Sequence, residues 1–141
     1  MRSGRGCAAI APAGHESFGS VGTCHIEEHH APQSEDCWLL APADMPDLSP
    51  RIIRQLLNKY NQREILVPTL ANRRGHPVLF PWGFAAEVRQ LREEEGVNAI
   101  VARRGSREIT CDDIEPSAID PFADIDTPDD YRDLSAPPPS P

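Results

Sequence analysis

The sequence predicts an α/β fold built around a mostly parallel β-sheet. Two short apolar runs, at residues 37–41 and 64–68, are typical of strands buried on both faces. The segment between them carries the apolar period of a helix. Strand, helix and strand in succession indicate two parallel strands joined by a right-handed crossover.

The helix between the two strands has a clear start. Ser49 is a favoured N-cap residue, and Pro50 suits the first helical position, where its missing N–H costs nothing. Apolar residues then recur at helical spacing for about three turns. They are Ile52, Ile53, Leu56, Leu57 and Tyr60.

Further elements are predicted along the rest of the chain. A turn at residues 71–75 leads into a strand at 76–80, and helices are expected around 84–91 and at 97–102. A strand follows at 107–111. The last helix begins with Thr127 as N-cap and Pro128 at the first helical position, and runs to about residue 134.

The two ends of the chain lack such patterns. Residues 1–24 mix small and polar side chains without a period of 2 or 3.6, which predicts loop or disorder, whereas residues 26–30 suit the end of a helix. The predicted organisation is an unrelated or disordered segment at 1–25, one domain at 26–134 and a disordered proline-rich tail at 135–141.

The charge balance argues against nucleic acid as a partner. The formal net charge is −8, with 22 acidic and 14 basic side chains, so the average surface repels a phosphate backbone. The arginine doublets 73–74 and 103–104 are candidates for binding a small phosphorylated ligand, although solvated surface is the alternative.

The chain shows no signal for export or membrane insertion. No run approaches the ~20 apolar residues of a membrane span, which predicts a cytoplasmic protein. Its four cysteines are scattered, so we expect them to be reduced. They are Cys7, Cys24, Cys37 and Cys111.

Two acidic positions could hold a cation. Asp44 follows the predicted strand 37–41, and Asp124 and Asp126 precede the last helix. In open parallel sheets, ligands bind beyond the carboxyl ends of the strands, and carboxylate oxygens suit Mg²⁺. The alternative is that each aspartate only caps a turn or a helix.

Histidines in two segments are further candidates for binding a ligand or a metal. Gly75 allows a close approach of the backbone to a ligand, and the adjacent His76 could hydrogen-bond a base, a phosphate or a pterin, unless it is a satisfied turn residue. His25 and His29 share a helical face, but the spacing of a zinc site is missing, which favours a solvated helix end.

Three strings, taken in order, resemble the motifs of the MobA-like NTP transferase family. Residues 38–57, WLLAPADMPDLSPRIIRQLL, resemble the segment in which a buried strand delivers a metal-binding aspartate. Residues 65–80, ILVPTLANRRGHPVLF, and 124–134, DIDTPDDYRDL, look most like the molybdenum cofactor cytidylyltransferases. The resemblance implies a Rossmann-like three-layer α/β/α nucleotidyltransferase fold whose N-terminal portion is missing.

The resemblance also implies a reaction and its residues. A phosphate oxygen of an acceptor such as molybdopterin would attack the α-phosphorus of CTP or GTP and release pyrophosphate. Asp44 and Asp126 would be the catalytic aspartates and would bind Mg²⁺ with the help of Asp124. The second substrate would lie beside Arg74, Gly75, His76 and Pro77.

The sequence departs from the family pattern in two places. Residues 1–36 contain no glycine-rich basic loop for a triphosphate, and residues 94–99, EEGVNA, lack an aspartate of the family motif. A truncated or frame-shifted reading frame, or a wrongly assigned gene start, would explain the first departure. Because donors for the triphosphate are missing, we expect weak or absent transfer by the 141-residue chain. The alternative function is an inactive binding module that self-associates through an exposed sheet edge.

Overall fold

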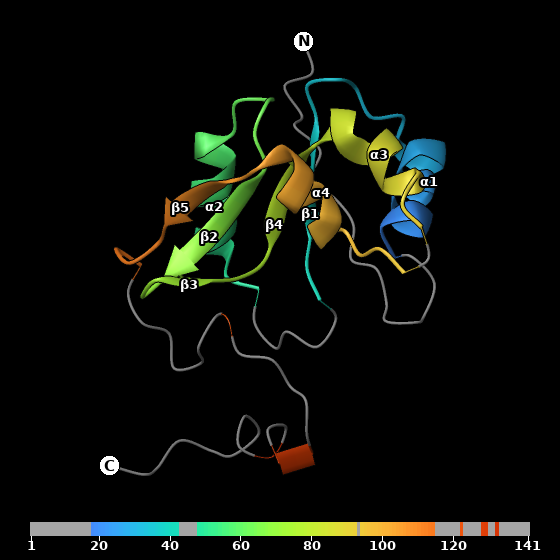
Figure 1. Ribbon diagram of the computed structural model, residues 1–141. Coiled ribbons are helices and arrows are strands. Elements are labelled where there is room, and N and C mark those ends of the chain that lie inside the picture. The colour runs from blue at the N-terminus through green and yellow to red at the C-terminus, as the bar shows by residue number, and fades with distance from the viewer. Residues whose placement is uncertain are drawn as a thin grey trace, which may run out of the picture.

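The computed structural model describes residues 18–42, 48–92, 94–114, 122, 128, 129 and 132, with only the backbone at 18–22. The described residues form a five-stranded sheet with helices on both faces, which confirms the predicted three-layer α/β architecture (Figure 1). The elements are α1 (Phe18–His30), β1 (Cys37–Leu40), α2 (Pro50–Lys59), β2 (Leu66–Leu70), β3 (Arg73–Arg74), β4 (Val78–Pro81), the 3₁₀-helix η1 (Trp82–Phe84), α3 (Ala85–Arg89), α4 (Asn98–Arg104) and β5 (Arg107–Thr110).

The sheet is mixed, so the predicted mostly parallel sheet is only partly correct. The strand order is β1-β4-β2-β3, and β5 also pairs with β2. Only the β2–β5 pairing is parallel among the described strands; β4 runs antiparallel to both of its neighbours. The physical reason is the short connection from β2 to β4, because a parallel crossover needs a dozen or more residues. The chain therefore reverses and places β4 between β1 and β2.

Helix α2 forms as predicted from the sequence. It begins at Pro50 after Ser49, although the Ser49 side chain makes no capping hydrogen bond. Its apolar face packs on the sheet, where Ile52 is 1% exposed and Leu56 is fully buried. Burial of each such side chain stabilises the fold by about 1.5–3 kcal/mol.

Helix α1 corrects the prediction that residues 1–24 are loop or disorder, because residues 18–24 are helical. Thr23 and Ile26 are buried, and Glu27 forms a 2.7 Å ion pair with Arg89 of α3. The glycine and serine residues of this helix are poor helix formers, so its stability comes from tertiary packing rather than from local propensity. Residues 1–17 lie outside the described residues.

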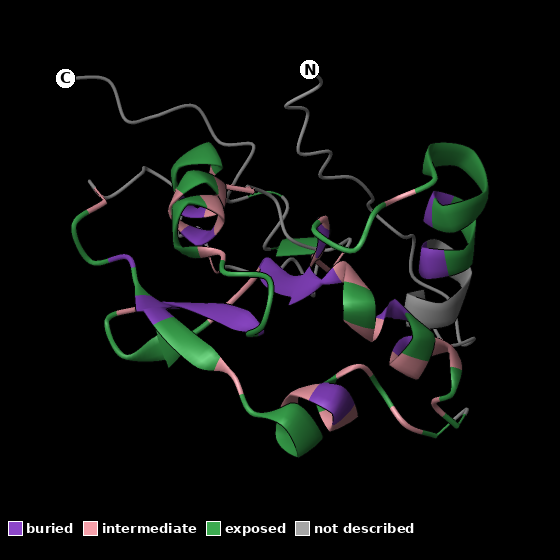
Figure 2. Cartoon of the chain, turned by 90° about the horizontal axis from the view of Figure 1, so that it is seen from above, coloured by how far each residue is buried: buried purple, intermediate pink, exposed green. Residues whose placement is uncertain are grey.

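The core of the described residues consists of two clusters, one packed under α2 and one under α3 and α4. The strands at the centre of the sheet are largely buried (Figure 2). The cluster under α2 includes Leu66, Leu79 and Cys111. The cluster under α3 and α4 includes Trp38 and Phe80, whose rings stack at 4.5 Å. Across the part of the chain that the structure describes, each helix is too short or too polar to cross a membrane.

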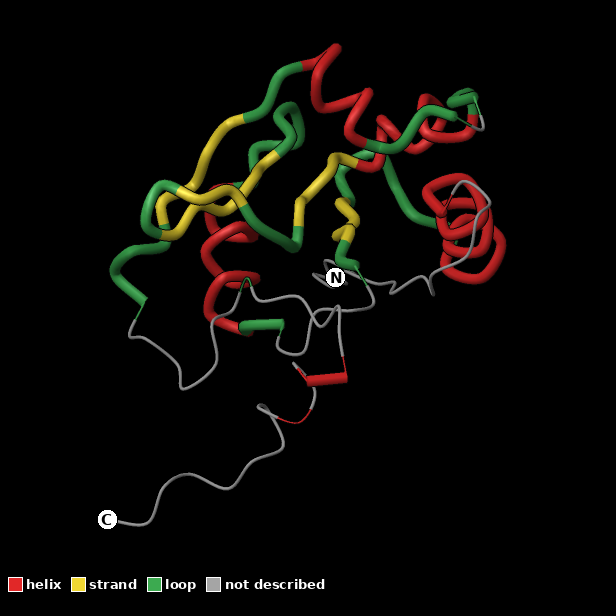
Figure 3. Tube along the Cα trace, turned by 60° about the horizontal axis from the view of Figure 1, so that its bottom comes forward, coloured by secondary structure: helices red, strands yellow, loops and turns green. Residues whose placement is uncertain are grey.

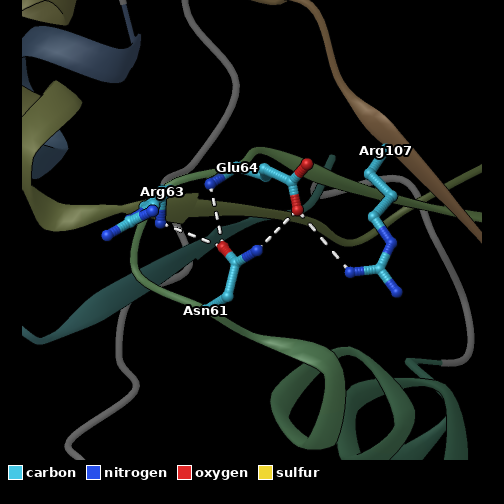
Figure 4. A network of polar contacts seen from close by, with 4 residues as sticks. All are labelled: Asn61, Arg63, Glu64 and Arg107. Atoms are coloured by element: carbon cyan, nitrogen blue, oxygen red, sulfur yellow. Dashed lines mark hydrogen bonds and ion pairs between the residues drawn. The ribbon is translucent and has the colours of Figure 1, made fainter.

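A polar network stabilises the loop between α2 and β2, at the edge of the sheet where β2 and β5 begin (Figure 4). The Asn61 side-chain oxygen accepts hydrogen bonds from the backbone N–H groups of Arg63 and Glu64, at 3.0 and 3.1 Å. The Glu64 carboxylate lies 3.6 Å from Arg107 of β5. These contacts join the start of β2 to the start of β5, so the role of these residues is structural.

The described cysteines should differ sharply in reactivity. Cys24 is exposed, whereas Cys37 and Cys111 are buried. Burial raises the pKa of the Cys111 thiol, and the nearby carboxylates of Asp113 and Asp112 raise it further. Because the thiolate is the reactive form, we expect Cys24 to react with a disulfide reagent within minutes at pH 8, before Cys37 and Cys111. Cys37 and Cys111 should become reactive only in denaturant.

Time-resolved labelling followed by peptide mass spectrometry checks this expectation. Cys24→Ser is the control variant, and it should remove only the fast labelling of its own peptide. Fast labelling of Cys111 in the native protein would contradict the expectation.

Candidate functional site

The directions of the strands define a candidate site at one edge of the sheet. Because β4 is antiparallel to both β1 and β2, and β5 is parallel to β2, the carboxyl ends of β1, β2 and β5 lie at the edge where β4 begins. The pairing of Leu40 with Val78 brings the end of β1 beside the start of β4. Figure 3 turns this edge toward the viewer. Ligands of open α/β sheets bind at such an edge.

The three predicted metal-binding aspartates, Asp44, Asp124 and Asp126, lie outside the described residues. Described residues flank them in the sequence. Leu40, the last residue of β1, precedes Asp44 by four residues, and Phe122 precedes Asp124 by two.

The segment predicted to face the second substrate connects β3 to β4. Arg74 is exposed, its Nε lies 3.2 Å from a Glu108 carboxylate oxygen, and its guanidinium also donates to the Ser106 hydroxyl. Gly75 donates its backbone N–H to the Pro68 carbonyl at 2.9 Å. The next two residues, His76, which is half-buried, and Pro77, which is buried, are joined by a cis peptide bond. Arg74 through Pro77 therefore lie at the edge defined above.

A tight hairpin turn joins this segment to β2, and a residue that follows β5 binds the turn. Ala71 and Asn72 have φ angles of 49° and 62°, the left-handed values that a two-residue type I′ turn needs. The Ala71 N–H donates to the Asp112 carboxylate at 2.7 Å. Gln55 of α2 donates to both carboxylate oxygens of Asp113, at 2.8 and 3.0 Å. The two acidic residues after β5 thus bind the hairpin and α2.

Asp112 and Asp113 were not singled out from the sequence. They follow the predicted strand 107–111 directly, which is the same signal that drew attention to Asp44. The structure shows that their described partners are protein donors.

Phe122 is a second residue that the sequence did not single out. A Cβ added at Gly75 would lie less than 3.0 Å from three carbons of the Phe122 ring, so the ring packs directly on the Gly75 backbone. Phe122 is half-buried and also packs against the α2-side core. No local pattern predicts this contact, because 47 residues separate Gly75 from Phe122 in the sequence.

The second arginine doublet lies on α4 and is engaged with acidic side chains. Arg103 pairs with Glu95, and Arg104 pairs with Glu87. The guanidinium of Arg104 also lies 5.5 Å from the centroid of the Phe84 ring. These contacts favour a structural role for this doublet rather than phosphate binding.

The histidine pair on α1 forms its own local contacts. The rings of His25 and His29 stack at 4.1 Å, and a ring nitrogen of His29 hydrogen-bonds to the His25 carbonyl at 3.0 Å. Within the described ranges, no group of three or more histidine, cysteine, aspartate or glutamate residues is arranged to hold a metal ion.

The ligand types predicted from the sequence can be compared with the one described cysteine that follows β5. The predicted ligands are all carboxylates, which suit Mg²⁺ or Mn²⁺. Cys111 follows β5, but burial raises the pKa of its thiol and keeps it protonated, so it is a poor metal ligand. The predicted ligands, if they hold an ion, are thus of the type that suits Mg²⁺ rather than Zn²⁺.

Comparison with known proteins gives one family match. The model of the MobA-like NTP transferase domain matches residues 6–109. No curated protein sequence matches the chain significantly.

Three mycobacterial structures are among the solved structures that are similar to this chain. Rv0371c from Mycobacterium tuberculosis H37Rv is 25% identical with a TM-score of 0.62, over 82% of this chain and 58% of that chain. Its complex with manganese is 25% identical with a TM-score of 0.63, over 85% and 60%. An Rv0371c homolog from Mycobacterium sp. strain JC1 is 28% identical with a TM-score of 0.55, over 70% and 48%. The match thus spans 48–60% of the length of these chains.

Proposed function

This chain belongs to the family of MobA-like NTP transferase domains, and we propose from that premise that it works as a metal-dependent nucleotidyltransferase. The proposed donor is CTP or GTP. The proposed acceptor is a phosphorylated small molecule such as molybdopterin, and the proposed cation is Mg²⁺, held by Asp44 and Asp126 with the help of Asp124.

One structural observation carries the proposal beyond the family. The carboxyl end of β1, the β2–β3 hairpin and the start of β4 meet at one edge of the sheet, which is where α/β folds bind nucleotides. Strand β1 ends at this edge four residues before Asp44 in the sequence, and the segment Arg74–Pro77 lies there as well. The manganese complex of Rv0371c, a similar structure, supports a divalent cation.

The proposed reaction needs positioning and charge neutralisation more than an acid or a base. An acceptor phosphate oxygen forms a bond to the α-phosphorus while the bond from that phosphorus to the bridging oxygen breaks, and pyrophosphate leaves. Bound Mg²⁺ would neutralise the charge that develops on the phosphate oxygens.

In the proposed reaction, different residues would bind the NTP and the acceptor. The aspartates would hold the cation and, through it, the triphosphate. Arg74 is exposed and can pair with a phosphate of the acceptor in place of Glu108. Gly75 would allow close approach of the acceptor, and His76 would hydrogen-bond it.

Nucleotide binding tests the proposal most directly, because turnover is expected to be slow without a glycine-rich triphosphate loop in the sequence. We would measure the affinity for ATP, CTP, GTP and UTP by calorimetry, with Mg²⁺, with Mn²⁺ and with EDTA. CTP or GTP should bind best, and only with a divalent cation. Pyrophosphate release would then be followed with a phosphorylated pterin acceptor. Equal affinity for all four nucleotides with and without a cation would overturn the proposal.

A further inference from the structure

The stacked histidines of α1 have no part in the proposed reaction. His25 and His29 lie four residues apart, so about one helical turn separates them, and both side chains are exposed. Their ring centroids are 4.1 Å apart, and the ring planes meet at 28°. Helix α1 packs on α3 at one side of the sheet (Figure 1). The two rings are therefore close together and accessible from solvent.

The spacing of the two rings suits a chelate for one metal ion. Two nitrogens bound side by side to one ion lie roughly 3 Å apart, because each metal–nitrogen bond is about 2.0–2.1 Å long. Rotation of two exposed side chains can bring rings that already stack to this separation. Histidines at positions i and i+4 of a helix are a known pair of zinc ligands. A closed four-ligand site, which the sequence argues against, is not needed, because water can fill the remaining positions.

A hydrogen bond prepares one of the rings for metal binding. The Nδ1 of His29 lies 3.0 Å from the His25 carbonyl oxygen. Since a carbonyl only accepts hydrogen bonds, Nδ1 carries the proton, and in the neutral ring Nε2 holds a lone pair. Metal-binding histidines usually donate their second ring N–H in this way, which fixes the orientation of the ring. His29 also belongs to the last turn of α1, where the helix dipole favours a positive charge.

We propose that His25 and His29 form a surface site for a divalent transition-metal ion that prefers imidazole, of the class of Ni²⁺, Zn²⁺ and Cu²⁺. The site is separate from the proposed Mg²⁺ site, because Mg²⁺ prefers oxygen ligands. An ion that bridges residues one turn apart binds the helical form of α1 in preference to the unfolded form, so it stabilises this helix.

Calorimetric titration of the full chain with Ni²⁺, in excess Mg²⁺, tests the proposal. The Mg²⁺ fills carboxylate sites and does not compete for imidazole. The wild type should bind Ni²⁺, and His25→Ala and His29→Ala should each lower the affinity at least about tenfold, since even outer-shell partners contribute 10–100-fold. The double variant should bind hardly more weakly than either single variant, because one histidine alone is no chelate. Small, fully additive losses would instead indicate two independent histidines and contradict the proposal.

His30→Ala and Cys24→Ser are matched controls. Both residues are exposed neighbours of the pair on α1, but neither belongs to the stack. Both controls should bind Ni²⁺ like the wild type. A loss in His30→Ala equal to that in His29→Ala would show that the histidines of this helix end attract the ion without a defined chelate, and the proposal would be wrong. Absence of Ni²⁺ binding by the wild type would have the same meaning.

Hydrogen exchange of the peptide 18–30 provides a second readout that involves no enzymatic activity. Saturating Ni²⁺ should slow the exchange of these amides in the wild type, because the bridged turn of α1 opens less often. The same Ni²⁺ concentration should leave the exchange in His29→Ala unchanged. Equal effects of Ni²⁺ on the two proteins would rule out a bridge between His25 and His29.

Discussion

Asp126→Asn is expected to lower the affinity for Mn²⁺ at least about tenfold, since even partners in the outer shell of a metal site contribute 10–100-fold. Metal-dependent pyrophosphate release should fall about 100-fold, because a charged ligand that neutralises the transition state is lost. The neutral amide has nearly the same shape as the carboxylate, so the change removes charge with little effect on packing. Asp44→Asn is expected to behave in the same way.

Asp129→Asn is the matched control for this experiment. Asp129 is exposed, and its carboxylate pairs with Arg132 at 2.8 Å. Exposed ion pairs of this kind contribute about 0–1 kcal/mol to stability. The control should therefore bind Mn²⁺ like the wild type. Similar losses in Asp129→Asn and Asp126→Asn would show that general negative charge attracts the ion, and would remove the assignment of specific ligands.

Phe80→Ala is expected to reduce the free energy of unfolding by about 3–5 kcal/mol, because it creates a cavity in the core. Phe80 is 1% exposed in β4, and its ring stacks on that of Trp38 in β1 with an interplanar angle of 17°. The substitution thus weakens the pairing that brings β1 beside β4. Domains of this size have a total stability of only about 5–15 kcal/mol, so the loss is a large fraction of it.

Urea unfolding followed by circular dichroism measures the effect. Phe84→Ala is the matched control, because it removes the same ring at a half-buried position where the ring contacts Arg104. The control should lose less than about 2 kcal/mol. Equal losses in the two variants would contradict the assignment of Phe80 to the core.

Local signals in the sequence predicted most of the fold. The start of α2 at Pro50 and the apolar runs of β1 and β2 were identified because caps and periodicity depend only on neighbouring residues. Helix α1 was missed over residues 18–24 because its packing on α3 outweighs the poor helix propensity of its small residues. The direction of β4 could have been predicted from the short connection that precedes it.

The candidate site was less predictable because it depends on contacts between distant residues. The Arg74–Pro77 segment was identified from the sequence, and the structure puts it at the carboxyl edge. The contact of Phe122 with Gly75 and the hydrogen bond from Ala71 to Asp112 leave no local trace in the sequence. The roles of Asp44, Asp124 and Asp126 stay predictions.

The reversal of the chain after β2 also affects how the sheet assembles. The β2–β3 pair Thr69 and Arg74 is five residues apart in the sequence, whereas the β1–β4 pair Leu39 and Leu79 is forty residues apart. Closing a loop eight times longer costs about 2 kcal/mol more in chain entropy. The hairpin is therefore the part of the sheet that forms with the least entropic penalty. It provides a local nucleus to which β4 and β5 can add beside β2, whereas β1 pairs only with β4 among the described strands.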